Sequence, residues 1–233
     1  MNRRRFMGIM AFVALASAIS CATNSVRRRL VEVAEEARIA FDPAWDGNME
    51  IYVMNPDGSD PRRLTHTPNG KDSWLPAWSP DRRRISFSSN RDGTWQLYVM
   101  NSDGTNLSQL TNTAGGDNWN TDWSPDGKRM AFDSNRDGGW ELYGMDSDGS
   151  NVRRLTHFSV NGEGAGNPDW SPDGTKIVFE VCADPECKGD RIEIYVMNTD
   201  GSNQPASVEH KAFLRKRAFL GEIFSVFSLN RDR

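Results

Sequence analysis

Apolar and polar positions alternate along most of the chain in short runs, and these runs return with a period of about 45 residues. One segment occurs three times: it opens with Trp-Ser-Pro-Asp, continues with polar residues, and ends in Phe. Apolar residues two positions apart indicate a strand with one buried face. The recurring apolar pairs are Ile39 and Phe41, Ile85 and Phe87, Met130 and Phe132, and Ile177 and Phe179.

A second recurring phrase, Glu or Gln followed by an aliphatic residue, Tyr, Val or Gly, and Met, is apolar on both faces of a strand. Such a strand is expected where a sheet is covered on both sides. Asp-Gly turns follow it, and Ser-Pro-Asp-Gly precedes the strand that ends in Phe, so tight hairpins join the strands. Arg82 replaces the Gly of one such turn, and a left-handed conformation there costs about 1 kcal/mol. The phrase lies at 50–54, 96–100, 141–145 and 193–197.

Each repeat is therefore interpreted as four short antiparallel strands, which form one blade of a β-propeller. The predicted fold is all-β, with about four 45-residue blades. The first unit lacks its first strand and the fourth lacks its last, so we expect an open or incomplete ring that self-associates through exposed blade faces. The units span 38–65, 74–111, 119–156 and 166–203, within a repeat region at 38–206.

The first 21 residues have the pattern of an export signal, with three arginines, an apolar stretch and small residues. Arg3 and Arg4 fit a twin-arginine signal, although Sec signals also begin with arginines. Residues 18–21 resemble a lipobox, which predicts lipidation of Cys21, a tether at 22–37, and a lipid-anchored location in the periplasm or cell envelope. The alternative is cleavage by ordinary signal peptidase, which leaves a soluble protein.

The tail at 207–233 breaks the repeat pattern and contains four phenylalanines and several basic residues. One interpretation is an amphipathic helix that contacts a membrane or a partner. The other is an altered reading frame that shortens a longer propeller.

Composition excludes some functions. The net charge of −4 and the absence of a basic stripe argue against nucleic acid as a partner. Cys182 and Cys187 flank an insertion and are predicted to form a disulfide in an oxidising compartment, with two free thiols as the alternative. Metal binding by this pair is disfavoured because no second Cys pair or paired His accompanies it.

Motifs for catalysis are missing: the sequence contains no nucleophile elbow, metalloprotease His pair, phosphate loop or dinucleotide fingerprint. We therefore expect no enzymatic activity, no cofactor and no metal. His66 and His157 occupy equivalent loops and are interpreted as surface residues. Asp122 and Asp169 precede tryptophans on the innermost strand, where they either hold a cation or are simply solvated.

Binding chemistry gathers in loops that are expected at one end of the blades. Aromatic anchors and arginines are typical of surfaces that recognise a protein or peptide. The alternative is that the repeated Asn-Arg-Asp-Gly is only a turn. The candidate partner-binding residues are Trp74, Arg91, Asp92, Asn118, Trp119, Asn120, Arg136 and Asp137.

The combination of W-S-P-D-G, a strand ending in Phe, E-[IL]-Y-V-M-N-x-D-G-S and R-R-L-T resembles the WD40-like repeat of the TolB family, over 38–203. The resemblance implies a propeller that binds an envelope protein or peptide, because TolB is a periplasmic partner of the peptidoglycan-associated lipoprotein. TolB also has a preceding α/β domain, for which this chain has no room. A second family with similar repeats is the gating propeller of serine oligopeptidases. The alternative function is thus a propeller remnant of that or another truncated protein, without activity of its own.

Overall fold

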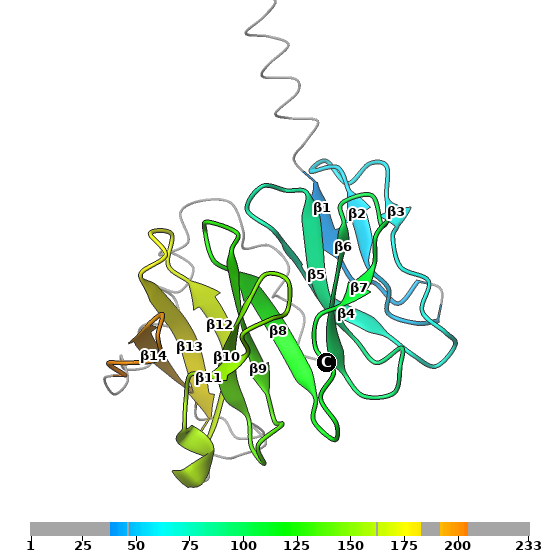
Figure 1. Cartoon of the computed structure of the whole chain (residues 1–233). Helices are drawn as coiled ribbons and strands as arrows, with labels where there is room; N and C mark the ends of the chain where they lie inside the picture. The colour runs from blue at the N-terminus through cyan, green and yellow to red at the C-terminus, as the bar shows by residue number, and fades with distance from the viewer. Residues whose placement is uncertain (1–37, 46, 162, 183–191, 205–233) are drawn as a thin grey trace, which may run out of the picture. The chain divides into compact units, whose positions relative to one another are not determined.

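The structure is a computed structural model that describes residues 38–45, 47–161, 163–182 and 192–204 (Figure 1). The predicted signal segment, the tether, Cys21, Cys187 and the tail at 207–233 lie outside these residues, so the predictions on them stay predictions. Within the described ranges, no helix is long and apolar enough to span a membrane.

In the described part of the chain, fourteen strands form four antiparallel sheets, and in each sheet the strands are neighbours in chain order. The first sheet contains β1 (Ile39–Phe41), β2 (Tyr52–Met54) and β3 (Arg62–Arg63). The second contains β4 (Ser73–Trp78), β5 (Arg84–Ser89), β6 (Gln96–Asn101) and β7 (Ser108–Gln109). The third contains β8 (Asn118–Trp123), β9 (Arg129–Ser134), β10 (Glu141–Asp146) and β11 (Arg153–Arg154). A 3₁₀ turn, η1 (Phe158–Asn161), leads to the fourth, with β12 (Gly164–Trp170), β13 (Lys176–Cys182) and β14 (Ile192–Asn198).

These sheets confirm the predicted propeller of about four blades. They are numbered here blade 1 to blade 4, and within the described residues blade 1 lacks the innermost strand and blade 4 lacks the outermost one. Contacts divide the chain into two compact units. The described part of the smaller unit is 38–39 and 53–61, where Arg38 and Asp60 form an ion pair at 3.2 Å.

The larger unit, 40–52 together with the chain from 62 onward, holds blades 2, 3 and 4. Its blades contact in a row: β8 lies against β4 and β5, and β12 lies against β8 and β9. One buried cluster joins Leu97 and Val99 of blade 2 to Trp123 and Phe132 of blade 3. A second joins blades 3 and 4 around Trp170. Trp123 and Trp170, which end the innermost strands of blades 3 and 4, thus pack on the preceding blade, which explains why this tryptophan recurs.

The Ser-Pro-Asp-Gly turns have the predicted geometry. The Ser124 hydroxyl donates to Asp126 at 2.6 Å and accepts from the Arg129 amide at 2.9 Å. Gly127 has φ of 68°, and Arg82 takes the same left-handed conformation at 60°. The substitution at Arg82 therefore keeps the turn and carries the backbone strain that was expected.

A buried carboxylate fixes the outermost strand of blade 3. Glu141 is fully buried and accepts hydrogen bonds from Arg154 Nη2 at 2.7 Å, the Ser159 amide at 2.6 Å and the Thr156 hydroxyl. Blade 1 repeats the network around Glu50. Blade 2 replaces the charged pair with Gln96 and Gln109. Gln96 accepts a hydrogen bond from the Thr111 hydroxyl at 2.9 Å, and Gln109 donates to the Thr111 carbonyl at 2.7 Å. The recurring Glu or Gln and Leu-Thr are therefore structural.

Candidate partner-binding surface

Three tryptophans from blades 2 and 3 form one aromatic cluster, Trp74 on β4, Trp95 just before β6 and Trp119 on β8. The Trp95 and Trp119 ring centroids are 4.4 Å apart, and Trp74 lies 5.2 Å from Trp95 and 5.4 Å from Trp119. All three side chains are partly exposed. Such tilted and edge contacts between aromatic rings are favourable beyond the area they bury.

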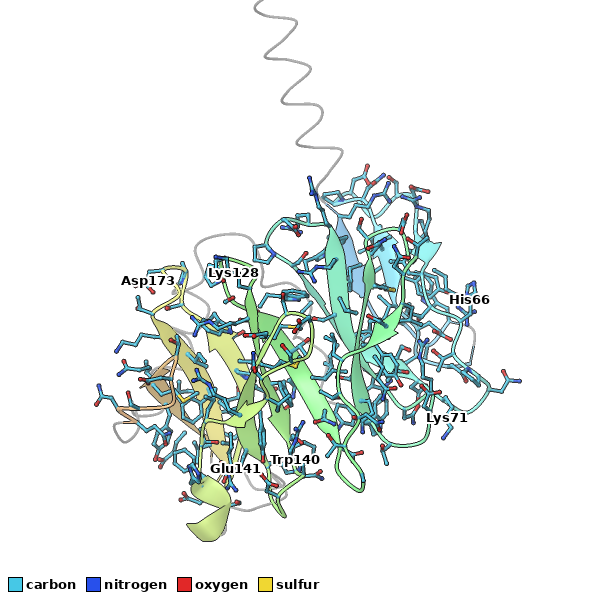
Figure 2. The ribbon with its side chains drawn as sticks, in the orientation of Figure 1. His66, Lys71, Lys128, Trp140, Glu141 and Asp173 are labelled. Carbon is cyan, nitrogen blue, oxygen red and sulfur yellow. The ribbon has the colours of Figure 1, made fainter. Side chains whose placement is uncertain are left out.

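The cluster occupies the end of the blades opposite the Ser-Pro-Asp-Gly turns. Figure 2 shows these two ends in blade 3, where Lys128 follows the turn at one end and Trp140, the counterpart of Trp95, lies at the other. Trp140 has no ring partner within the described residues, because Gly166 stands in blade 4 where blade 3 has Trp119. The aromatic cluster is therefore particular to blades 2 and 3.

The indole nitrogens of Trp74 and Trp119 are buried and have no hydrogen-bond partner in the part of the chain that the structure describes. Buried donors are normally satisfied, but the indole nitrogens of Trp78 and Trp170 are unpaired in the same way, so this feature is not particular to the cluster. Two of the predicted partner-binding residues are thus brought together. Trp95, which was not among the predicted binding residues, joins them. Its position, before the Glu or Gln of the recurring phrase, also holds Met49 and Trp140, and this repetition was the available signal.

The predicted arginines lie in a different environment. The Arg136 guanidinium stacks 4.6 Å from the Tyr143 ring and 5.2 Å from the Phe132 ring, and it donates to Asn118 at 2.5 Å. Arg91 lies in the same way over Phe87 and Tyr98. Burial lowers the pKa of both arginines. Blade 1 fills the equivalent slot with Trp45 and blade 4 with Phe158. This arrangement agrees with the structural alternative for the Asn-Arg-Asp-Gly repeat.

The remaining predicted residues also have partners within the chain. Asp137 accepts from the Tyr143 hydroxyl at 2.6 Å and Asp92 from Tyr98 at 2.7 Å. Burial, and then this hydrogen bond, raise the pKa of each tyrosine. Asn118 is buried and donates to Gln96 at 2.9 Å. Because these polar residues already form hydrogen bonds within the chain, the contacts do not test whether they bind a partner, and that role stays a prediction.

Asn120 and its counterparts occupy a β-bulge in each innermost strand. Leu75, Asn120 and Asn167 have φ of 57°, 47° and 52°, and the strand register shifts beside each of them. Asn120 donates to Asp133 at 2.9 Å, and the amide of Asn167 approaches the same carboxylate oxygen at 3.4 Å. The sequence pattern did not predict these bulges. Leu rarely adopts a left-handed conformation, so Leu75 gave no reason to expect one at this position of the strand.

The residues predicted to hold a cation, Asp122 and Asp169, are not part of the aromatic cluster. Asp122 accepts a hydrogen bond from the Trp170 amide at 2.6 Å, which joins blade 3 to blade 4. No group of three His, Cys, Asp or Glu side chains suited to a metal occurs within the described residues. Cys182 ends β13 and is disulfide-bonded. Its predicted partner, Cys187, lies outside the described residues, so the pairing itself stays a prediction.

Antiparallel blades, each with a Ser-Pro-Asp turn between its first two strands, define the chain as a β-propeller protein. The TolB beta propeller domain family matches residues 34–111 and 69–205. The chain therefore belongs to this family, as the repeat motifs indicated. No curated protein matches it.

Solved structures agree with this assignment. The putative TolB from Agrobacterium tumefaciens is 29% identical with a TM-score of 0.64, over 73% of this chain and 60% of its own length. TolB from Acinetobacter baumannii is 24% identical with a TM-score of 0.59, over 73% of this chain and 41% of that one. A puromycin-hydrolyzing peptidase from Mycobacterium tuberculosis shares the fold at 17% identity and a TM-score of 0.52, over 68% of this chain and 24% of that one. The chain thus spans less than two thirds of each of these proteins.

Proposed function

We propose that this chain is a non-enzymatic β-propeller module of the cell envelope that binds a protein or peptide through the cluster of Trp74, Trp95 and Trp119. The observation that carries the proposal is this cluster of three partly exposed rings, with centroids 4.4 to 5.4 Å apart. Tryptophan is enriched among the residues that dominate binding energy at protein interfaces. Membership of the TolB propeller family supports an envelope partner.

The indole nitrogens of Trp74 and Trp119 are buried, so a partner meets the exposed parts of the rings and not the N–H groups. These ring surfaces provide apolar contact for the side chains of an extended peptide segment. Arg91 and Arg136 contribute by holding the adjacent loops through their stacking on buried aromatic rings. They act as positioning residues in this proposal.

The test uses the partner that the resemblance implies, the soluble domain of a peptidoglycan-associated lipoprotein, titrated calorimetrically into the full chain. Trp95→Ala and Trp119→Ala should each weaken binding at least about tenfold, which corresponds to about 1.4 kcal/mol. Trp140→Ala is the matched control because it removes an equivalent indole outside the cluster. Equal affinities for all three variants, with circular dichroism showing intact sheets, would refute the proposed surface.

Location is part of the same proposal: the chain is exported and anchored by lipid on Cys21. Cys21→Ser should move the protein from the membrane fraction to the soluble envelope fraction. Arg3 and Arg4 to Lys should block export through the twin-arginine route and change little through Sec. A wild-type protein that is already soluble after lysis would contradict the lipid anchor.

A further inference from the structure

Blade 3 departs from the repeat at one position of its third strand. Gly144 stands on β10 where blades 1, 2 and 4 have Val53, Val99 and Val196. In blade 2, Val99 is buried against Trp123 of the next blade, with only 7% of its surface exposed. The corresponding tryptophan facing Gly144 is Trp170, so blade 3 leaves out the side chain that fills this space elsewhere.

The backbone does not require glycine here. Gly144 is not among the residues with positive φ. The nearest atoms to a Cβ atom at this position would belong to the Leu155 side chain, the first at 3.4 Å, which is ordinary contact. Gly149 differs, since a Cβ there would approach the Leu110 carbonyl oxygen to 2.6 Å. The space beside Gly144 is therefore left open although a valine side chain is compatible with the strand.

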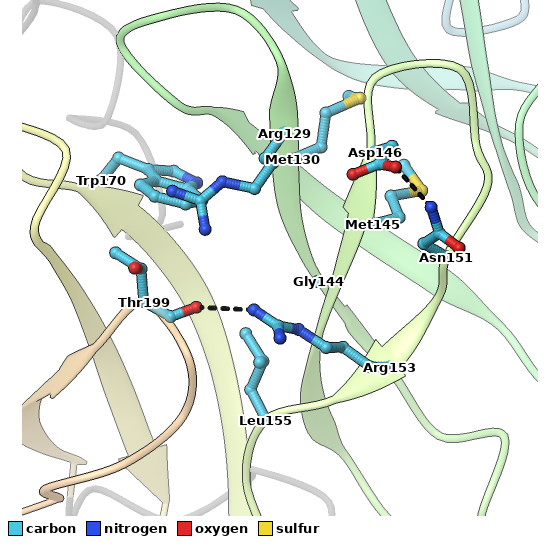
Figure 3. Close-up of a pocket in the computed structure, with 10 residues that line it drawn as sticks. All are labelled: Arg129, Met130, Gly144, Met145, Asp146, Asn151, Arg153, Leu155, Trp170 and Thr199. Atoms are coloured by element: carbon cyan, nitrogen blue, oxygen red, sulfur yellow. Dashed lines mark hydrogen bonds between the residues drawn. The ribbon is translucent and has the colours of Figure 1, made fainter.

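A pocket of about 280 Å³ occupies this space between blades 3 and 4 (Figure 3). That volume is at the small end of ligand sites. Trp170 forms one wall, and Leu155 lies at the base beside Gly144. Figure 3 shows the side chains of Arg129 and Arg153 extending to the same side of Gly144, the first toward Trp170 and the second toward Thr199. The pocket thus combines an apolar wall with two guanidinium groups.

The charges in the pocket favour an anion. The Arg129 guanidinium lies 4.8 Å from the Trp170 ring, and Arg153 donates one N–H to the Thr199 carbonyl at 3.2 Å. Neither arginine forms an ion pair with a carboxylate within the described residues. The acidic side chain at the rim, Asp146, accepts a hydrogen bond from Asn151 at 2.6 Å. Asp200 lies nearby, and hydrogen bonds from Ser202 lower its pKa, with a smaller contribution from Arg153.

We propose that this pocket binds a compact organic anion, a carboxylate that carries a short branched apolar group. The apolar group takes the place of the missing valine side chain against Trp170, and the carboxylate accepts hydrogen bonds from Arg129 and Arg153. Guanidinium and carboxylate groups match in geometry and charge. The same chemistry is presented by a free branched acid and by the C-terminal residue of a peptide ending in valine.

Blade 2 supplies an internal comparison. Arg84 lies 4.7 Å from the Trp123 ring, as Arg129 lies over Trp170. However, Val99 fills the space and Ser108 stands where blade 3 has Arg153. Blade 2 therefore has the stacked arginine without the space or the second cation, and we propose an anion site only in blade 3.

Isovalerate is the probe, titrated into the full chain and followed by saturation-transfer NMR, with uncharged isovaleramide as the control ligand. Binding of isovalerate with an affinity at least about tenfold above that of the amide is expected. Gly144→Val fills the pocket with the residue of the other blades and should abolish binding. Arg153→Gln removes the charge and should weaken isovalerate at least about tenfold while leaving isovaleramide unchanged.

A short peptide ending in valine, compared with its C-terminal amide, separates the two sources. Tighter binding of the peptide acid than of isovalerate assigns the site to a chain terminus, and the reverse order assigns it to a free acid. Either order supports the pocket. No detectable isovalerate or peptide binding, equal binding of isovalerate and isovaleramide, or unchanged binding to Gly144→Val would overturn the proposal.

Discussion

Asp133 is a buried carboxylate whose replacement by asparagine should stabilise the fold at neutral pH. Its side chain lies on β9 with 6% of the residue surface exposed. One oxygen accepts from Asn120, whereas the other is buried without a hydrogen-bond partner in the described chain. Burial raises the pKa of Asp133 to about 6. The negative charge of Glu180 adds to this rise, whereas the hydrogen bonds to the carboxylate oppose it.

The stability of the fold depends on pH because the folded and unfolded states bind the proton of Asp133 with different affinity. The folded-state pKa lies above the ordinary value of 3.8, so the folded protein binds the proton more readily than the unfolded chain. Ionised Asp133 therefore lowers stability above about pH 6, and this cost disappears as the pH falls toward the unfolded-state value. The pKa values of Asp133 in the folded and unfolded states differ by about two pKa units, which corresponds to about 3 kcal/mol. This value is an upper limit for the free energy of unfolding that Asp133→Asn can add.

Urea unfolding followed by circular dichroism between pH 4 and pH 8 measures this gain. Asp133→Asn should raise the free energy of unfolding by up to about 3 kcal/mol at pH 7.5, and the gain should vanish near pH 4. Asp126→Asn is the control with the opposite sign, because the Ser124 hydroxyl and the Lys128 amide lower the pKa of that exposed turn carboxylate. A variant at Asp133 that is less stable at pH 7.5, or a difference that does not depend on pH, would refute the reasoning.

Three further changes test the repeat contacts by denaturant unfolding. Glu141→Gln should lower the free energy of unfolding by about 2 kcal/mol at pH 7, because Arg154 loses its carboxylate partner. The double variant Glu141→Gln with Arg154→Gln has the same residue pair as blade 2 and should recover part of this loss. The loss should shrink in acid, since hydrogen bonds from Thr156 and Ser159 outweigh burial and lower the pKa of Glu141, so its contribution fades as the pH falls through that value. Arg82→Gly should gain about 0.5 kcal/mol, the relief of left-handed strain less the weak contact of Arg82 with the Trp78 ring at 5.8 Å, whereas Arg82→Ala should not gain. Ala131→Ser should raise the free energy of unfolding by about 1 kcal/mol, because the new hydroxyl would accept from the Trp170 indole N–H, which has no hydrogen-bond partner among the described residues. Ser86 accepts from Trp123 in this way at 2.9 Å, and an unchanged unfolding midpoint would contradict the prediction.

Local patterns were sufficient to predict the blades. The alternation at Ile85 and Phe87, the two-sided strand at 96–100 and the Ser-Pro-Asp-Gly turns depend on residues close in sequence, and β5, β6 and the turns lie where these patterns placed them. The contacts between blades were not predicted. Which indole meets Trp95, and how far Asp133 is buried, depend on residues more than 20 positions away, for which one sequence gives no distance.

The differences between blades carry more functional information than the features that blades share. Glu141 with Thr156, Arg136 over Tyr143, and the Ser124 turn each recur, and the structure gives each a role in holding strands together. A recurring residue is therefore weak support for a binding site in a propeller built from such similar units. Trp119 facing Trp95, where blade 4 has Gly166, is found in one place only within the described residues, and so is the open space at Gly144. At Gly144 one blade departs from the repeat without a need of the backbone, so selection for stability alone would have kept the valine of the other blades. Gly166 differs, because a Cβ atom there would approach the Asp133 carboxylate to 2.7 Å, and packing alone accounts for the missing tryptophan in blade 4.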